Sequence, residues 1–309
     1  MYDNTHMTRQ LLTTLTAALF FAGCGVSNAD FTEVDDDTVQ EGSELSTVYW
    51  SHVTIRHDDR RCASPMCGGW WVKDVNRPNS REQYVSALNF APSKLDDASI
   101  ELAQGPDVVL QGRLELSRGS SYYKFRVFNA WRGLPGKAPG ARDTFYRVNT
   151  ANIQCVRAPC PSLSSYKLNN GATSYFMGTD LSRASTGQLD QDWVISRINT
   201  KGALVAGTFT QVNRVGVGTE TILDAAQVYL KLPELPGPCP QFKLAACQPG
   251  YVHSYTRNED RCIVPTGCVI APRCAQIRPG CATDYTAVTW NGPCPQWSCD
   301  PTFTLPPAE

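Results

Sequence analysis

The sequence has little net charge and few histidines. Its formal charge is −1 at pH 7, so it lacks the basic field that nucleic-acid binding requires, and we expect no nucleic-acid partner. The four histidines are His6, His52, His57 and His253. His52 and His57 are five residues apart on a predicted strand, which places their side chains on opposite faces. No metal site is therefore predicted.

The motifs of common catalytic sites are also missing. The sequence contains no Gly-x-Ser-x-Gly elbow, no His-Glu-x-x-His pair and no phosphate-binding glycine loop followed by Lys-Ser/Thr. We therefore predict no catalytic residue, no cofactor and no enzymatic activity. A hydrolase that uses adjacent carboxylates, such as Asp96 and Asp97, is the weakest alternative, because neighbouring acids are usually solvated surface.

Positive charge is absent from a long stretch near the N-terminus. Between Gln10 and Ile55 there is no lysine or arginine, whereas acidic residues are crowded into residues 25–45. Segments of this composition repel themselves and stay extended. Residues 25–45 are therefore predicted to be an acidic tether that holds a folded part away from an anionic membrane.

The tether follows a short apolar segment. After Arg9, residues 11–22 form an apolar run that is too short to span a bilayer as a helix. The run ends in Ala22-Gly23-Cys24, which resembles the lipobox of bacterial lipoprotein signal peptides. This resemblance implies that residues 1–24 hold the signal peptide and the lipidated Cys24, with Met1 or Met7 as the start. A plain secretory signal or a buried helix is the alternative.

The same resemblance suggests a location. Residue 25 is glycine and not aspartate, which in Gram-negative lipoproteins favours the outer membrane. We therefore expect a cell-envelope protein, anchored to the membrane by lipid at Cys24.

Cysteine usage agrees with export to an oxidising compartment. Beyond Cys24 there are twelve cysteines, an even number that predicts six disulfides and no free thiol. Two pairs, Cys62 with Cys67 and Cys155 with Cys160, enclose short proline-containing loops typical of local disulfides. A zinc site shared by the two loops, or pairing between them, is the alternative. The other eight are Cys239, Cys247, Cys262, Cys268, Cys274, Cys281, Cys294 and Cys299.

Residues 46–232 are predicted to form a mainly β domain, a small sandwich or partly open barrel built of hairpins. Short runs of β-branched and aromatic residues alternate here with glycine, proline and asparagine. Residues 47–56 are the first predicted strand, and residues 84–90 fit a strand or a short helix. Residues 107–135 and 202–233 share a hairpin pattern with a repeat of about 95 residues and one buried face each. Duplication or convergence explains this repeat.

Trp70 and Trp71 follow the first cysteine loop and are a candidate binding platform for glycan or peptide. The simpler interpretation follows from the alternation of side chains along a strand. One tryptophan then fills the core, and the other lies under the disulfide loop.

Three motifs resemble an uncharacterised family of secreted or lipid-anchored proteins from predatory Gram-negative bacteria, a domain of unknown function. They are Arg-Cys-Ala-Ser-Pro-Met-Cys-Gly-Gly at residues 61–69, Ala-Trp-Arg-Gly at residues 130–133 and Cys-Val-Arg-Ala-Pro-Cys-Pro-Ser at residues 155–162. The resemblance covers about residues 47–232. It implies an exported domain and carries no activity.

A proline-rich linker at residues 233–238 leads into two cysteine-rich modules, residues 239–271 and 272–299, and a tail at residues 300–309. Each module has four cysteines and too few aliphatic residues for a core of its own, so disulfides must hold it. The spacing resembles antistasin-like inhibitor repeats, without their closing cysteine cluster. Because a semi-rigid linker precedes them, we expect the modules to fold and function apart from the β domain.

The longest loop of each module, between its second and third cysteine, is the predicted contact surface. These loops carry the side chains that most often dominate interfaces, namely Tyr251, Arg257, Tyr285 and Trp290. The leading prediction is a lipid-anchored envelope protein that binds an envelope protein or glycan, or has a structural role. A protease inhibitor acting through a cysteine-rich loop is the alternative.

Overall fold

A computed structural model describes residues 50–305, apart from 117–118, 120, 157, 185–188, 217, 236 and 276–279. The signal segment, Cys24 and the acidic tether lie outside the described residues. Residues 48–309 form one compact unit. Among the residues that the structure describes, no helix has the length and apolar character needed to cross a membrane.

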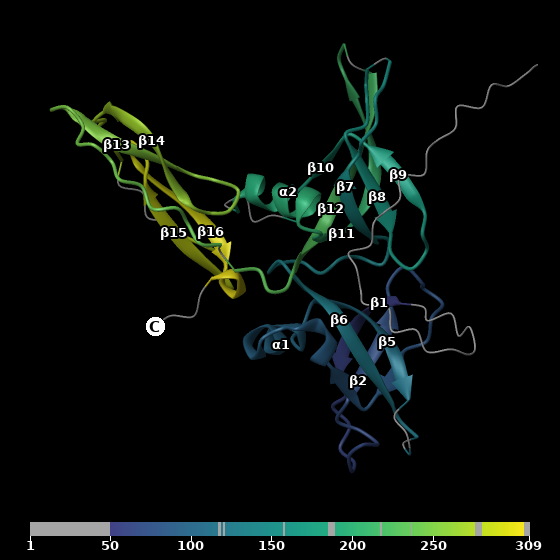
Figure 1. Cartoon of the computed structure of the whole chain (residues 1–309). Coiled ribbons are helices and arrows are strands. Elements are labelled where there is room, and N and C mark those ends of the chain that lie inside the picture. Colours follow the sequence, from purple (N-terminus) through teal and green to yellow (C-terminus); the bar gives the residue numbers. More distant parts are fainter. Residues whose placement is uncertain are drawn as a thin grey trace, which may run out of the picture. The chain divides into compact units, whose positions relative to one another are not determined.

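One large sheet dominates the fold (Figure 1). Its first half contains β1 (Ser51–His57), β2 (Trp70–Asp74), β3 (Gln83–Val85), β4 (Ala87–Asn89), η1 (Ala91–Ser93), α1 (Asp97–Ala103), β5 (Val108–Leu116) and β6 (Tyr123–Gly133). Its second half contains β7 (Thr144–Thr150), β8 (Leu163–Lys167), β9 (Thr173–Phe176), β10 (Gly178–Asp180), α2 (Gln191–Thr200), β11 (Leu204–Arg214) and β12 (Gly218–Lys231).

The two halves have the same topology. The strand order is β3-β2-β1-β5-β6 in the first half and β9-β8-β7-β11-β12 in the second, joined by antiparallel pairing of β6 with β12. In both halves the fourth strand pairs in parallel with the last one, β4 with β6 and β10 with β12. The repeat expected from the two hairpins therefore extends over the whole β domain, which we describe as two repeats.

Matching details support the repeat. The β5–β6 pair has a register shift at Gly112, and the β11–β12 pair has one at Gly207. At each position a Cβ would collide with the backbone carbonyl of the partner strand, Arg126 or Asp224, so only glycine fits. Each helix begins after an aspartate, Asp96 or Asp190, whose carboxylate accepts a backbone N–H of the first turn.

Two asparagines join the repeats reciprocally. Asn76 and Asn169 each have a φ of 58°, a left-handed conformation that asparagine tolerates better than most residues. Asn76 Nδ2 donates to the carbonyls of Phe145 (2.7 Å) and Leu168 (3.0 Å), and its Oδ1 accepts from the Phe145 N–H (2.8 Å).

The second asparagine mirrors the first. Asn169 Nδ2 donates to the carbonyls of His52 (2.7 Å) and Val75 (3.0 Å), and its Oδ1 accepts from the His52 N–H (2.8 Å). Each amide satisfies backbone groups of the other repeat, on its first strand and directly after its second strand. The pair therefore holds the two half-sheets together.

Three apolar clusters fill the space around the sheet. One lies around α1 in the first repeat, one around α2 in the second, and the third is shared between the repeats through Trp131 and Tyr229. His52 borders the third cluster, where burial, helped by the charge of Arg147, lowers its pKa to about 4. The imidazole is therefore neutral at pH 7.

Strand centres are apolar on both faces because the third cluster covers the face that the other two leave open. On β5, for example, Val108 and Leu110 belong to the cluster around α1, and Val109 belongs to the third cluster. The ends of the hairpins differ from the sequence prediction. Leu114, Leu116 and Tyr123 are exposed, because β5 and β6 extend past the covered part of the sheet.

The C-terminal region forms two hairpins. Strands β13 (Tyr251–Arg257) and β14 (Ile263–Ile270) make the first, and β15 (Tyr285–Asn291) and β16 (Pro295–Pro301) make the second, which η2 (Thr302–Thr304) follows. Each is held by two disulfides that pair its first cysteine with its third and its second with its fourth: Cys239–Cys262, Cys247–Cys268, Cys274–Cys294 and Cys281–Cys299.

The second hairpin also packs on the β domain. Tyr285 and Cys299 belong to the cluster around α2, and the Tyr285 hydroxyl donates to the Pro135 carbonyl at 2.8 Å. The linker is tied as well, because Arg197 of α2 donates to Glu234 at 2.7 Å. These contacts were not predicted, since separate folding of the modules was expected.

The predicted fold class, mainly β with disulfide-rich modules at the C-terminus, is confirmed, and the sheet is not closed into a barrel. The cysteine loops contain the local disulfides Cys62–Cys67 and Cys155–Cys160. Residues 84–90, which fit a strand or a helix, contribute to β3 and β4. The first strand begins at Ser51, later than expected.

Candidate functional site

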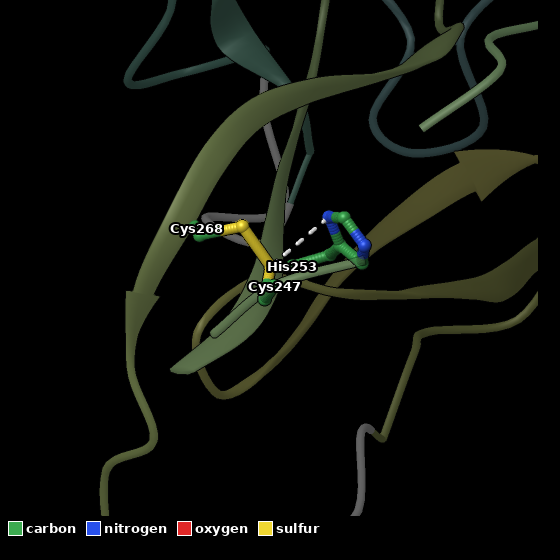
Figure 2. Close-up of side chains that lie close together, drawn as sticks. All are labelled: Cys247, His253 and Cys268. Carbon is green, nitrogen blue, oxygen red and sulfur yellow. Dashed lines mark hydrogen bonds between the residues drawn. A yellow bond between two sulfur atoms is a disulfide. The ribbon is translucent and has the colours of Figure 1, made fainter. Parts of the chain in front are cut away.

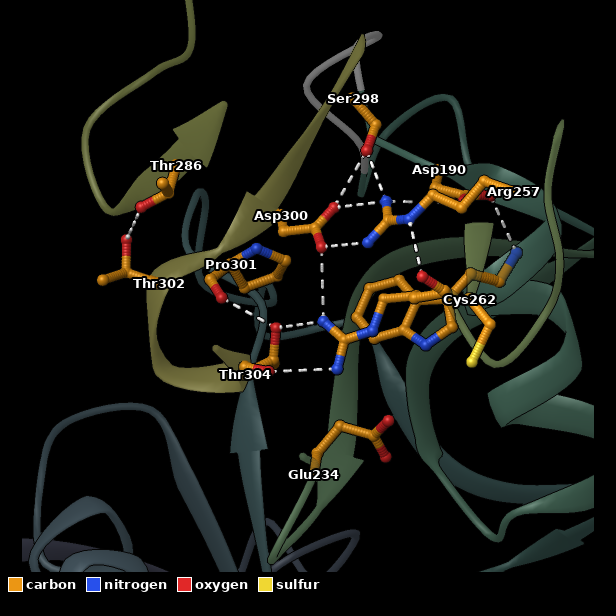
Figure 3. A network of polar contacts seen from close by, with 12 residues as sticks. Asp190, Glu234, Arg257, Cys262, Thr286, Ser298, Asp300, Pro301, Thr302 and Thr304 are labelled. Carbon is orange, nitrogen blue, oxygen red and sulfur yellow. Dashed lines mark hydrogen bonds and ion pairs between the residues drawn. The ribbon is translucent and has the colours of Figure 1, made fainter. Parts of the chain in front are cut away.

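A buried ionic network lies where the two C-terminal hairpins meet (Figure 3). Arg257 on β13 forms a bidentate ion pair with Asp300 on β16, and it also donates to the Ser298 hydroxyl. Arg261 approaches the same carboxylate at 3.4 Å and donates to the hydroxyl and carbonyl oxygens of Thr304 at 2.6 and 3.0 Å. Two arginines therefore share one buried aspartate.

A tight turn positions both arginines. Asn258 Oδ1 accepts the backbone N–H groups of Asp260 and Cys262 at 3.1 and 2.8 Å, and Arg261 has a φ of 64°. The Cys239–Cys262 disulfide fixes the end of this turn. The turn therefore holds Arg257 and Arg261 on the side that faces the second hairpin.

The network compensates the charges inside it. Burial alone would raise the pKa of Asp300, but the hydrogen bond and charge of Arg257, with further contributions from Ser298 and Arg261, hold it below its ordinary value of 3.8. The side chains of Arg257 and Arg261 are 4% and 1% exposed. Buried ions of this kind persist only when they are paired and hydrogen-bonded.

The network extends to the β domain. The guanidinium carbon of Arg261 lies 4.6 Å from the ring centroid of Trp193 on α2, a cation–π distance. Ser196, also on α2, donates to Glu259 of the first hairpin at 2.7 Å. The helix of the second repeat therefore contacts the first hairpin through charged and aromatic side chains.

A cleft of about 400 Å³ opens beside this network. Its lining comes from the start of α2, from β13 and from the second hairpin, and it comprises Leu189, Asp190, Thr256, Arg257, Trp290, Trp297 and Ser298. Its volume is within the usual range of small-molecule sites, about 300–1,000 Å³. We call it the Trp290 cleft.

The charged groups of the Trp290 cleft are already occupied. Asp190 accepts the Trp193 N–H at the start of α2 and lies 3.8 Å from Arg257, which is paired with Asp300. Ser298 donates to Asp300 at 2.9 Å. The two indoles are left as the main apolar surfaces for a ligand.

Trp70 and Trp71 belong to a different surface. Trp70 packs against the core of the first repeat, whereas Trp71 faces outward, with the guanidinium carbons of Arg56 and Arg60 each 5.1 Å from its ring. Tyr84 is beside Trp71 and donates to the Pro65 carbonyl in the disulfide loop at 2.9 Å. We call this row the Trp71 stack.

The second repeat lacks this stack. In the register that brings Arg56, Trp71 and Tyr84 side by side, it carries Asn149, Ser164 and Tyr175. The repeated fold therefore does not require the stack. Both of its arginines already have a carboxylate partner, since Arg56 pairs with Glu82 at 2.6 Å and Arg60 with Asp58 at 2.8 Å.

Cys247, His253 and Cys268 lie together on the first hairpin, as candidate metal ligands (Figure 2). The two sulfurs are bonded to each other, and His253 Nδ1 lies 3.4 Å from the Cys247 sulfur. Metal binding by cysteine requires thiolates. With the disulfide formed, this cluster offers only an imidazole.

The structure brings together two of the four residues proposed in the hairpin loops. Arg257 lies 5.7 Å from the Trp290 ring, and both line the cleft. Tyr285 is buried against the β domain and Tyr251 is exposed elsewhere. Sequence reasoning missed Asp190, Trp297 and Asp300. Asp190 could have been recognised as the N-cap of α2 from its residue type, but nothing in the neighbouring sequence connects it to the hairpins.

Asp96, proposed as part of a carboxylate pair, is the cap of α1 and accepts the Ser99 N–H at 2.7 Å. His52 is buried between the repeats, and His57 is half exposed and lies 3.0 Å from Asp59. In the described part of the chain, neither histidine is placed beside Asp96.

The fold and the cleft define a class of protein: a duplicated β domain with two disulfide-held hairpins and an aromatic cleft beside them. Residues 51–235 match the family model of a domain of unknown function, DUF6748, and the chain belongs to this family. The match spans both repeats, so the duplication is a property of the family domain.

The chain is also similar to an uncharacterized protein of Dictyostelium discoideum. The two are 24% identical over 307 residues, which cover 95% of this chain and 96% of the relative. This similarity extends past the family domain into the hairpins. No solved structure matches the chain.

Proposed function

We propose that this protein is a lipid-anchored binding protein of the cell envelope and that its ligand occupies the Trp290 cleft. The observation that carries the proposal is the cleft itself, where two tryptophans from one hairpin line a hollow beside buried, compensated charges. Concave surfaces with aromatic walls and a few polar groups are typical ligand sites. The six disulfides support an oxidising, extracytoplasmic location.

Binding suits the cleft better than catalysis. Among the described residues that line the cleft, the hydroxyl that lies against a carboxylate is that of Ser298, and its partner Asp300 is held ionised by Arg257 and Arg261. A carboxylate with a lowered pKa and two ion pairs is a poor general base. Among the described residues that line the cleft there is no histidine or cysteine.

Inhibition of a protease gains less support. The first hairpin has two arginines to offer a protease pocket, Arg257 and Arg261, and both side chains are buried in the ionic network. A residue must be exposed to enter another protein's active site. Outer-membrane anchoring in a Gram-negative envelope, as the lipobox resemblance implies, fits a binding role.

The cleft is tested with a soluble form that starts at residue 25, which leaves the compact unit of residues 48–309 intact. We expect this form to sediment with isolated envelope material and Trp290→Ala to weaken the interaction about tenfold or more, because a buried tryptophan contact typically contributes more than 1.4 kcal/mol. The matched control is Trp50→Ala, which changes a 44% exposed tryptophan on the β domain.

Equal binding by wild type and Trp290→Ala would contradict a site in the Trp290 cleft. The variant Trp71→Ser then decides whether the Trp71 stack carries binding, since serine occupies the corresponding position of the second repeat.

Anchoring is tested at Cys24. Cys24→Ser is expected to abolish incorporation of a fatty-acid probe and to release the protein from the membrane fraction or block its processing, because a hydroxyl cannot form the thioether. The control is Cys62→Ser/Cys67→Ser, which removes a local disulfide and should keep the label. Equal label in wild type and Cys24→Ser would remove the lipoprotein proposal.

A further inference from the structure

We infer that the ligand of the Trp290 cleft is a neutral saccharide, one or two rings of which lie against the indoles. This inference rests on the proposed function, because it names the class of ligand for the same site. Three features of the cleft support it: the origin of its tryptophans, its charge balance and its remaining polar groups.

The tryptophans are not required by the hairpin fold. Tyr251 and Tyr285 each follow the second cysteine of their hairpin by four residues, so Trp290 corresponds to Thr256 in the first hairpin. Counted back from the last cysteine, Trp297 corresponds to Thr266. Both hairpins form the same two disulfides without these indoles in the first one. Trp297 packs against the apolar cluster around α2, so contact with the β domain accounts for it. Trp290 belongs to none of the three apolar clusters of the described residues, so it is the tryptophan that needs an explanation beyond folding.

The charge balance indicates a ligand without net charge. Two negative groups, Asp190 and Asp300, and two positive groups, Arg257 and Arg261, lie in and directly behind the cleft. The next ion pair, Arg197 with Glu234, is balanced as well. An anionic ligand would approach two carboxylates, and a cationic ligand would approach two guanidinium groups. Either one would have to break an existing pair, and breaking a buried pair costs several kcal/mol.

The remaining groups fit hydroxyl-rich rings. An indole offers a flat apolar face and one N–H donor. Both oxygens of Asp190 already face a protein group, the Trp193 backbone N–H and Arg257, so the polar group at the edge of the cleft is the exposed Thr256. A sugar ring presents C–H groups on its faces and hydroxyls around its rim, so it pairs with both kinds of surface. The cleft volume of about 400 Å³ leaves no room for a long chain inside it.

The test is calorimetric titration of the soluble form with tetrasaccharides of matched size. The neutral probes are tetramers of glucose, galactose, mannose and N-acetylglucosamine; the charged probes are tetramers of glucosamine and of galacturonic acid. We expect at least one neutral probe to bind, and we expect its dissociation constant to change less than about twofold between 0.05 and 0.5 M NaCl, because screening acts only between charges.

Two variants tie binding to the cleft. Trp290→Ala should raise the dissociation constant of the neutral probe at least about tenfold. For Trp290→Phe, which keeps an aromatic face, the dissociation constant should stay within about threefold of the wild-type value. Trp50→Ala should bind as wild type does. The far-ultraviolet spectrum and the absence of free thiols show that each variant is folded.

The outcomes separate the two claims. If only a charged probe binds and Trp290→Ala abolishes it, the neutral class is wrong and the cleft remains the site. If no probe binds while envelope binding still depends on Trp290, the saccharide inference is wrong and the proposed function stands. If Trp290→Ala changes neither envelope nor saccharide binding, both are wrong.

Discussion

Replacing Asn169 with alanine is expected to lower the free energy of unfolding by about 3–5 kcal/mol. The substitution removes three hydrogen bonds to the backbone of His52 and Val75, each worth about 1 kcal/mol. Of the three backbone groups, the His52 carbonyl keeps a partner, the Val75 N–H at 3.0 Å. It also places alanine at a φ of 58°, which costs about 1–2 kcal/mol. Denaturant unfolding with the disulfides intact measures the change.

Three further variants make this test specific. Asn169→Gly removes the strain and keeps the loss of hydrogen bonds, so it should fall between wild type and Asn169→Ala. Asn76→Ala should cost about as much as Asn169→Ala, because its three bonds have the same lengths. The control is Asn170→Ala at the exposed neighbouring position, with a change within about 0.5 kcal/mol. Equal stability of Asn169→Ala and Asn170→Ala would contradict the role of the asparagine pair.

Replacing Asp300 with alanine is expected to be similarly costly, at about 3–5 kcal/mol, because it leaves Arg257 and Arg261 buried without their shared carboxylate. The same denaturant titration measures it, with tryptophan fluorescence as the signal, since Trp290 and Trp193 lie against these arginines. Asp59→Ala is the control, because its side chain is 93% exposed. A change as small as that of the control would mean that the network does not stabilise the fold.

The contribution of Asp300 depends on pH in a defined direction. Its pKa in the folded protein lies below the ordinary value of 3.8, so the folded state holds the charged form more strongly than the unfolded chain does. The stabilisation is present above that ordinary value and is lost as the pH falls through the lower folded value. The stability difference between wild type and Asp300→Ala should therefore shrink below about pH 4.

The sequence predicted the local features of the fold well. Cysteine spacing indicated the two loop disulfides. The hairpin pattern indicated the repeat, because both hairpins have a glycine, Gly112 and Gly207, at the equivalent position. The rest of the repeat escaped detection. The regions β1–β3 and β7–β9 have the same backbone conformation at Asn76, after β2, and at Asn169, after β8. Few of their equivalent positions carry the same residue type; Trp71, for example, corresponds to Ser164.

The candidate site was predicted only in part for a related reason. Arg257 and Trp290 were recognised as side chains typical of interfaces, but their environment depends on contacts across the fold. Asp300 is 43 residues from Arg257 in the sequence, and Asp190 belongs to the other side of the linker. Residue type suggests that an arginine is available for binding; only the packing shows that its charge is already occupied.

The disulfides also bear on how the chain is made. Each one closes within a single loop or hairpin, and the widest spans 23 residues in sequence. A chain that emerges from an export channel in N-to-C order therefore completes each cysteine pair of the two loops before the next pair appears. In each hairpin only four cysteines compete at a time. Oxidation can then follow export, with few wrong pairings for an isomerase to correct.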